Sequence, residues 1–172
     1  MSTIAALSEF PLLLQLAVNR TPEAQWQTRA RDGSFALVEH AWHLADLEQE
    51  GFNIRIRRLL GETDPVLPDF PGAELARKRR YIKELPAPAV ARFQAARAEN
   101  LRRLKGVSGE QWLRRGTQDG VGELSLGRIP AMMLEHDHMH ANELVALLGE
   151  LKVTVPKTLA TFAALQPLAR SA

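Results

Sequence analysis

Residues 133–151 read MLEHDHMHANELVALLGEL and hold three of the five histidines of the chain. One set of side chains in this stretch recurs at spacings of three and four: Met133, His136, His140, Leu144, Leu147 and Leu151. Residues so spaced share one face of a helix, so His136 and His140 lie on the stripe that should be buried. His138 is rotated by about 200° from His136 and should point outward.

The spacing of His136 and His140 is the one with which a helix presents two imidazoles to a single metal ion. The alternative is a pair of core histidines that are hydrogen-bonded to neighbouring residues. Burying an imidazole without any partner would cost about 1–3 kcal/mol, so a partner is required in either case. The pair alone leaves both interpretations open.

A second helical segment, EHAWHLADLE (39–48), holds the other two histidines. Its apolar stripe consists of Leu37, His40, Leu44, Leu47 and Ile54, with His43 on its flank. One histidine from this segment, added to His136 and His140, would give three nitrogen ligands and leave positions open for water or substrate, as in catalytic zinc sites. Periodicity alone does not choose between His40 and His43.

Helical spacing of apolar residues extends along the whole chain, and alternating, strand-like runs are nearly absent. Long helical segments are predicted at about residues 4–19, 34–61, 73–105 with a break at 85–89, and 126–151. The sequence therefore predicts an all-α four-helix bundle, in which ligand and metal sites lie between facing helices. We expect a single domain over residues 1–172, with a short C-terminal extension from about residue 152.

Several local features of this bundle carry expectations of their own. Ser34 is a plausible cap for the second helix, and Pro130 requires the last helix to begin later or to be kinked. The proline-rich stretch 62–72 and the glycine-rich stretch 116–125 are expected to be loops. The tail after Pro156 could pack on the bundle or on a second subunit.

The composition excludes several kinds of chemistry. The chain has no cysteine, so disulfides and thiolate ligands are absent and any metal must be held by nitrogen and oxygen. No segment approaches the roughly 20 apolar residues that span a membrane, and the N-terminus lacks the features of a secretory signal. We therefore expect a cytoplasmic protein without a membrane partner.

Basic residues gather in the runs RIRR (55–58), RKRR (77–80) and LRRLKG (101–106), although the formal net charge is only +2. These runs fall in helical segments, beside glutamates and without aromatic neighbours, so they are expected to be solvated helix faces. Binding of an anionic ligand, a partner or nucleic acid is the alternative, and nucleic acid is the least expected of these.

The histidine segments resemble the motifs of the DinB-like, YfiT-type superfamily of metalloenzymes. Members typically open the second helix with Trp-Ser, followed by Glu and then by His-Leu-Ala-Asp-x-Glu; the matching residues here are Phe35, Ala36, Glu39 and HLADLE from His43 to Glu48. The last helix of the family carries His-Asp-x-x-His, which is matched by His136, Asp137 and His140. The resemblance covers about residues 5–148 in order and spacing.

This resemblance implies an up-and-down bundle of unusual connectivity, often dimeric, that binds a divalent metal ion such as zinc, nickel or iron. By position, the three ligands are His43, His136 and His140. His40 would then support a ligand or lie on the surface. Glu143, where the family often has Gln, could orient an imidazole, act as a base or simply be a solvated helix residue.

Characterised relatives include transferases and isomerases that use low-molecular-weight thiols. The resemblance thus implies a metal-dependent enzyme acting on a small molecule, by transfer of a thiol from a cosubstrate or by hydrolysis. The apolar tail at 159–169 and the habit of the family suggest a homodimer. The sequence does not identify a general base among its candidates, which are Asp137, Glu135, Asp46 and Glu39. A non-catalytic bundle that binds a metal ion or a partner is the alternative.

Overall fold

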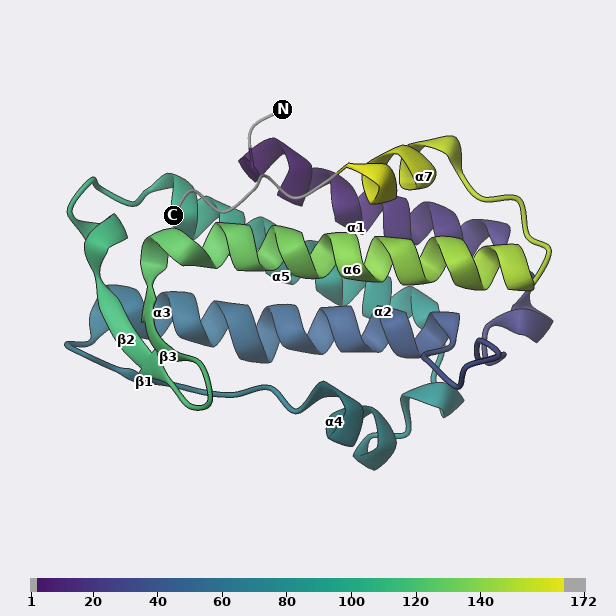
Figure 1. The fold of residues 1–172 in the computed structure, drawn as a ribbon, viewed down its shortest axis with the longest axis horizontal. Helices are drawn as coiled ribbons and strands as arrows, with labels where there is room; N and C mark the ends of the chain where they lie inside the picture. Colours follow the sequence, from purple (N-terminus) through teal and green to yellow (C-terminus); the bar gives the residue numbers. More distant parts are fainter. Residues whose placement is uncertain (1–2, 166–172) are drawn as a thin grey trace.

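The computed structural model describes residues 3–165, in which long helices lie side by side in a bundle (Figure 1). The long helices are α1 (Thr3–Arg20), α2 (Leu37–Asp46) continued through a π-helical turn (Leu47–Phe52) into α3 (Asn53–Gly61), α5 (Pro86–Lys105) and α6 (Ile129–Glu150). The predicted all-α four-helix bundle is confirmed. Within residues 3–165, no helix combines the length and apolar character that a membrane crossing requires.

Short elements connect and cover the long helices. They are the 3-10 turns Glu23–Gln25, Tyr81–Lys83, Gln111–Leu113 and Leu126–Arg128, the helices α4 (Gly72–Lys78) and α7 (Lys157–Ala164), and the strands β1 (Val66–Leu67), β2 (Arg115–Gln118) and β3 (Gly122–Ser125). Helix α7 packs on α1 and α6, so the described part of the C-terminal tail lies on its own bundle. Residues 166–172 of the tail lie outside the described residues.

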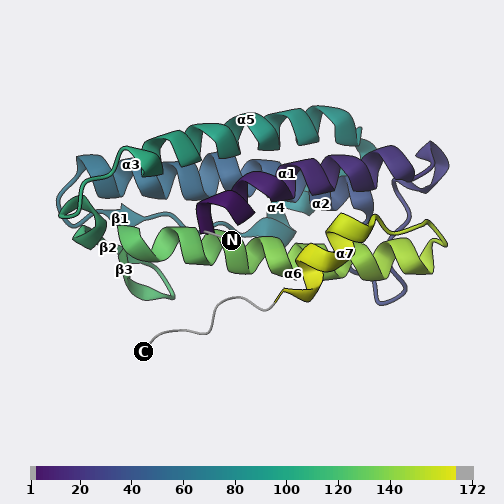
Figure 2. The ribbon, with the colours of Figure 1, turned by 90° about the horizontal axis from the view of Figure 1, so that it is seen from above.

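The order of the long helices brings distant parts of the chain together. Helix α1 packs against α5 and α6, and α2 packs against the same two helices. Helices α1 and α6 run in one direction, whereas α2–α3 and α5 run in the other (Figures 1 and 2). The parallel pair α2 and α5 needs a long connection, which carries α4 back along the bundle. This connectivity places α2 beside α6, where the histidines are.

A small sheet at one end of the bundle corrects the expectation that strands are nearly absent (Figure 1). Strand β1 pairs in parallel with β2, and β2 pairs antiparallel with β3. The two stretches that were predicted as loops, 62–72 and 116–125, therefore supply its strands. Gly120 and Gly122 have φ angles of 71° and 93°, which glycine adopts without strain and which turn the chain between β2 and β3.

Helices α2 and α6 begin later than the sequence predicted. Helix α2 begins at Leu37, where Glu39 Oε2 accepts the backbone N–H of Ala36 at 3.0 Å. The expected capping role of Ser34 is wrong, because the N-cap position of α2 is occupied by Ala36, two residues later. Helix α6 begins at Ile129, so Pro130 lies in the first turn, where the missing N–H has no partner to lose.

The π-helical turn rotates the second half of the α2–α3 helix. A π turn closes i to i+5 hydrogen bonds and so takes up extra residues relative to a period of 3.6. Ile54, which was predicted on the buried stripe, is only partly buried, whereas Arg55 and Ile56 are buried. Arg55 therefore departs from the prediction that the basic run 55–58 is a solvated face.

Candidate metal centre

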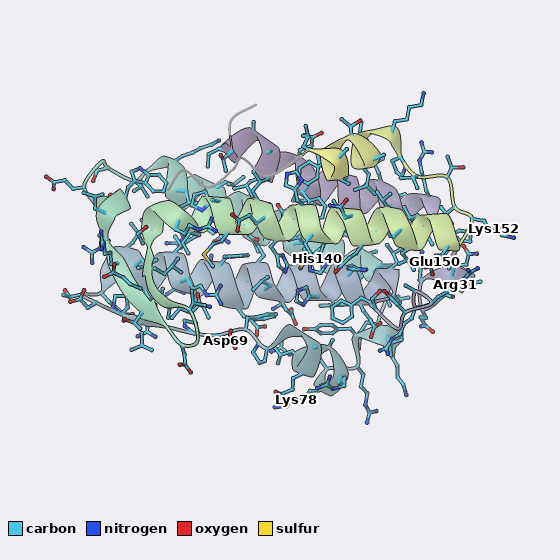
Figure 3. The ribbon with its side chains drawn as sticks, in the orientation of Figure 1. Arg31, Asp69, Lys78, His140, Glu150 and Lys152 are labelled. Atoms are coloured by element: carbon cyan, nitrogen blue, oxygen red, sulfur yellow. The ribbon has the colours of Figure 1, made fainter. Side chains whose placement is uncertain are left out.

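Three histidine side chains converge between α2 and α6. His43 comes from α2, and His136 and His140 come from successive turns of α6. His43 Nε2 lies 3.2 Å from His136 Nε2, and His140 Nε2 lies 3.1 Å from the same atom. His140 lies where α6 faces α2 (Figure 3). The structure thus brings together the three residues that the resemblance implies as ligands.

The rings of this centre are largely removed from solvent. His43 is 9% and His140 is 3% exposed, and His136 is partly buried. The ring of His43 packs against the rings of Phe35 and Phe70, at centroid distances of 5.4 Å and 5.8 Å. These aromatic contacts hold the His43 ring in the orientation that directs Nε2 toward α6.

Gly72, the first residue of α4, lies directly against the ring of His43. A Cβ atom added to Gly72 would lie 2.6 Å from Nδ1 of His43 and closer still to its Cε1 atom. Such distances are far shorter than van der Waals contact, so only glycine lets the connection approach the ring this closely. The sequence does not reveal this role, because a glycine that follows a proline is also typical of an ordinary turn.

Burial keeps His40, His43 and His136 neutral. Burial, together with a smaller effect of the neighbouring His140, lowers the pKa of His43 to about 3. Burial, together with the same histidine neighbours, lowers the pKa values of His136 and His40 well below the ordinary 6.5. A neutral imidazole keeps a lone pair on one nitrogen, which is the form that binds a metal ion.

The three Nε2 atoms fit a divalent cation. Zinc–nitrogen distances of about 2.0–2.1 Å in a tetrahedral site place two ligand nitrogens about 3.3 Å apart. The observed separations of 3.2 Å and 3.1 Å are close to that value. The all-nitrogen donor set is one that zinc, nickel and iron accept.

The second nitrogen of His140 is also engaged. His140 Nδ1 lies 2.8 Å from Glu143 Oε2 and 3.0 Å from His40 Nδ1. A carboxylate that accepts the Nδ1–H of an imidazole fixes the ring and leaves the lone pair on Nε2. Of the roles left open by the sequence, the structure therefore places Glu143 in contact with His140, and His40 as a buried residue rather than a surface one.

The sequence model of the DinB superfamily matches residues 6–144. The chain belongs to the DinB superfamily. A search of curated protein sequences finds no match. Among solved structures, the chain is similar to YfiT from Bacillus subtilis, which is described as a probable metal-dependent hydrolase with an unusual four-helix bundle topology. The two chains are 21% identical, with a TM-score of 0.81, and the match covers 88% of this chain and 87% of YfiT. At this identity the likeness establishes the fold.

Two cavities flank the histidines of this DinB-superfamily chain. The larger, of about 820 Å³, lies between the second helix, α6 and the hairpin of β2 and β3. The smaller, of about 520 Å³, lies between α4, the start of α2 and α6. His43, His136 and Met139 line both cavities. A group bound at the centre could thus be approached from two sides.

Each of the four carboxylates that the sequence offered as a candidate general base forms an ion pair with an arginine. Glu39 pairs with Arg29, Asp46 with Arg79, Glu135 with Arg128 and Asp137 with Arg97. Each of these carboxylates thus has a guanidinium as its direct partner rather than a histidine of the centre. The carboxylate that contacts a member of the centre directly is instead that of Glu143.

Two motif residues of the DinB superfamily form a separate buried cluster beside the centre. Arg97 of α5 contacts Asp137 of α6 at 2.6 Å and 2.9 Å, and it donates to Glu48 Oε2 at 3.0 Å. Asn100 adds a hydrogen bond of 2.8 Å to Glu48 Oε1. This ion-pair cluster connects three helices of the bundle. The sequence does not link Glu48 to Asp137, because their shared partner Arg97 lies in neither motif.

His138 lies apart from the centre, as predicted, but the prediction that it points outward is wrong. It is 5% exposed, and its ring stacks on that of Phe162 in α7, with centroids 4.5 Å apart and planes 10° from parallel. Phe162 also stacks on Phe10 of α1. The second apolar face of α6 is thus covered by α7, which the helical period of α6 could not reveal.

Proposed function

We propose that this protein is a metal-dependent enzyme in which His43, His136 and His140 hold one divalent ion, such as zinc, nickel or iron. The observation that carries the proposal is the convergence of three Nε2 atoms at 3.1 Å and 3.2 Å beside two cavities. Three protein ligands leave at least one position open, which is typical of a catalytic rather than a structural ion. The similarity to YfiT, itself described as a probable metal-dependent hydrolase, also supports this assignment.

The ion would supply Lewis acidity, which activates water or a thiol at neutral pH. The residues of this chain would hold and shape that site. Glu143 would hold the Nδ1 proton of His140, and the rings of Phe35 and Phe70 would keep the orientation of His43. The walls of the two cavities would bind the small-molecule substrate and limit the access of bulk water.

Two reactions fit this site. Hydrolysis of a small molecule is supported by the description of YfiT. Transfer of a low-molecular-weight thiol to an electrophile is supported by the two cavities, because such a reaction brings two substrates to one centre. The chain has no cysteine, so the thiol would come from a cosubstrate. A non-catalytic, metal-braced bundle is less well supported, since a structural ion needs no cavity beside it.

A homodimer remains part of the proposal and rests on the resemblance to dimeric relatives. The argument from the apolar tail is weaker than the sequence suggested, because Leu159 and Phe162 are buried within their own chain.

Metal content tests the proposal most directly. Protein purified without a polyhistidine tag should contain about one divalent ion per chain, and His43→Ala, His136→Ala and His140→Ala should each lower metal affinity by about 100-fold or more, because two nitrogens remain. His138→Ala is the matched control and should keep its ion. Full occupancy in all three ligand variants, or loss confined to His138→Ala, would show that the centre is assigned to the wrong residues.

A further inference from the structure

We propose that Arg55 binds an anionic group of the substrate, a carboxylate or a phosphate, inside the larger cavity beside the histidine centre. The inference rests on the proposed function, because the anionic group would belong to the substrate that binds at the histidine centre. It arises from a buried arginine that the π-helical turn carries to the interior and that lines this cavity.

Arg55 is a buried cation without a carboxylate partner. It is 4% exposed, and its Nε donates to the carbonyl of Pro68 at 3.1 Å. Among residues 3–165, no carboxylate lies within 4.0 Å of its guanidinium, and neither terminal nitrogen has a hydrogen-bond partner. Burial lowers the pKa of Arg55, and the charge of Asp69 raises it only in part. A guanidinium nevertheless stays charged in proteins, so this charge is offset only in part by Asp69 and has no ion-pair partner among the described residues.

The other arginines of the same cavity have partners. Arg115 pairs with Glu123 at 2.5 Å, and Arg128 pairs with Glu135 at 2.7 Å. The cavity lining therefore carries one more arginine than glutamate, and the excess positive charge lies on Arg55. A divalent ion at the centre would add to this positive potential, so the cavity favours an anion over a neutral or cationic ligand.

Arg55 is also close enough to the centre for one molecule to reach both. The ring of Phe52 is near both, with its centroid 6.3 Å from that of His136 and 5.6 Å from the guanidinium carbon of Arg55. The distance from the guanidinium carbon of Arg55 to the ring centroid of His136 therefore cannot exceed the sum of these two distances. An ordinary small metabolite spans that length.

The free atoms of the guanidinium define the class of ligand. Nε is held by Pro68, so Nη1 and Nη2 remain as a fork with two parallel donors. Carboxylates and phosphates accept such a fork with two hydrogen bonds, which are stronger than bonds between neutral groups. If Arg55 only braced the segment around Pro68, its removal would affect stability but not the choice between charged and neutral ligands.

The test compares two probes that differ only at the end remote from the thiol: mercaptohexanoate and mercaptohexanol. The protein is loaded with cobalt(II), and the thiolate-to-cobalt charge-transfer absorption reports binding of each probe without any need for turnover. In the wild-type protein, mercaptohexanoate should bind about 10–100-fold more tightly, as expected for charge-assisted hydrogen bonds. Arg55→Met should remove this preference and leave mercaptohexanol binding unchanged, and Arg55→Lys should keep part of it.

A matched control removes an ion pair from the same cavity without changing its net charge. The double variant Arg115→Met with Glu123→Gln should retain the full preference for mercaptohexanoate. Equal affinity for both probes in the wild-type protein, or an undiminished preference in Arg55→Met, would overturn the inference.

A failure of the proposed function looks different, because neither probe would then give the charge-transfer band. In that case the metal-free protein still tests Arg55 through thermal unfolding in the presence of hexanoate or hexanol. Hexanoate should raise the melting temperature of the wild-type protein more than hexanol does, and this difference should vanish in Arg55→Met. An equal effect of the two compounds on the wild-type protein would reject the anion site.

Discussion

Adjacent residues of α6, His136 and Asp137, reach into two buried polar clusters that are built in opposite ways. The histidine centre consists of converging imidazole nitrogens and borders two cavities. The ion-pair cluster around Asp137 is charged, lines neither of these cavities and surrounds Arg97 with acceptors, among them the carbonyl of Leu7 at 2.8 Å. The first cluster is where we propose that a metal ion binds, whereas the second is complete within the chain.

This difference suggests separate roles for the two clusters, one in stability and one in the proposed function. A buried polar group costs free energy unless it is paired, so the complete cluster supports the native fold, whereas the proposed ion would pair with the nitrogens of the other cluster. The same criterion distinguishes Arg97, which has partners on three elements, from Arg55, which has one backbone acceptor. Residue type and burial are alike for these two arginines, and only the partners reveal their different roles.

The largest effect should come from breaking the complete cluster. Arg97→Met leaves the carboxylates of Asp137 and Glu48 buried without their cation, and should lower the free energy of unfolding by about 3–5 kcal/mol in denaturant titrations. A triple variant that also carries Asp137→Asn and Glu48→Gln has no unpaired charge and should recover much of the loss. If the triple variant unfolds as readily as Arg97→Met alone, charge pairing is not what the cluster contributes.

Metal affinity should depend on Glu143 to a smaller extent. Glu143→Ala removes the acceptor that contacts His140 Nδ1 and should weaken zinc binding by about 10–100-fold, measured by competition with a chromophoric chelator. Glu143→Gln keeps an acceptor oxygen and should lose less. Neither variant should alter stability in the metal-free state by more than about 0.5 kcal/mol, because Glu143 is partly exposed. Wild-type affinity in Glu143→Ala would leave the carboxylate without a role at the centre.

Acid should affect the two clusters with opposite signs in the metal-free protein. The pKa of His43 is about 3 in the folded chain and about 6.5 when unfolded, so the unfolded chain binds more protons below pH 6.5 and stability falls as the pH falls. Each such histidine contributes up to about 1.4 kcal/mol per pH unit. Burial raises the pKa of Asp137 from 3.8 to about 6, against the opposing effect of Arg97, so protonation of Asp137 favours the folded chain as the pH falls.

Denaturant titrations between pH 7 and pH 5 can separate these contributions. His43→Gln should make the stability of the protein less dependent on pH, and Asp137→Asn should make the acid loss steeper. A His43→Gln variant with the pH dependence of the wild-type protein would mean that His43 is not held neutral by burial.

Much of the fold followed from the helical spacing of apolar residues. That spacing placed His136 and His140 on one buried face, because both lie on a single regular helix whose period is a local property. The partner of this pair was not accessible in the same way. Periodicity left His40 and His43 open, and the resemblance to the DinB-like motifs was needed to choose His43.

The predictions that were wrong depend on contacts between elements or on irregular turns, which the regular period of a helix does not reveal. The π-helical turn at Leu47–Phe52 rotates the helix that follows it. Arg55 is therefore buried where the sequence predicted that Ile54 would be. The small sheet forms because strands from two distant connections pair with each other, and short strands of this kind carry little periodic signal. The contact of Gly72 with His43 likewise depends on where the connection lies, which no local pattern encodes.

The smallest predicted effect concerns His138, which shares α6 with both clusters but faces α7. His138→Ala removes a ring that stacks on Phe162 and should lower the free energy of unfolding by about 1 kcal/mol, the usual contribution of an aromatic pair. Zinc affinity should not change, because the ring contributes no atom to the centre. Limited proteolysis should show faster cleavage near α7 in His138→Ala, whereas His140→Ala should lose zinc and leave α7 protected. Loss of zinc in both variants would mean that the two faces of α6 are coupled, and that the distinction between a liganded face and a packing face does not describe this helix.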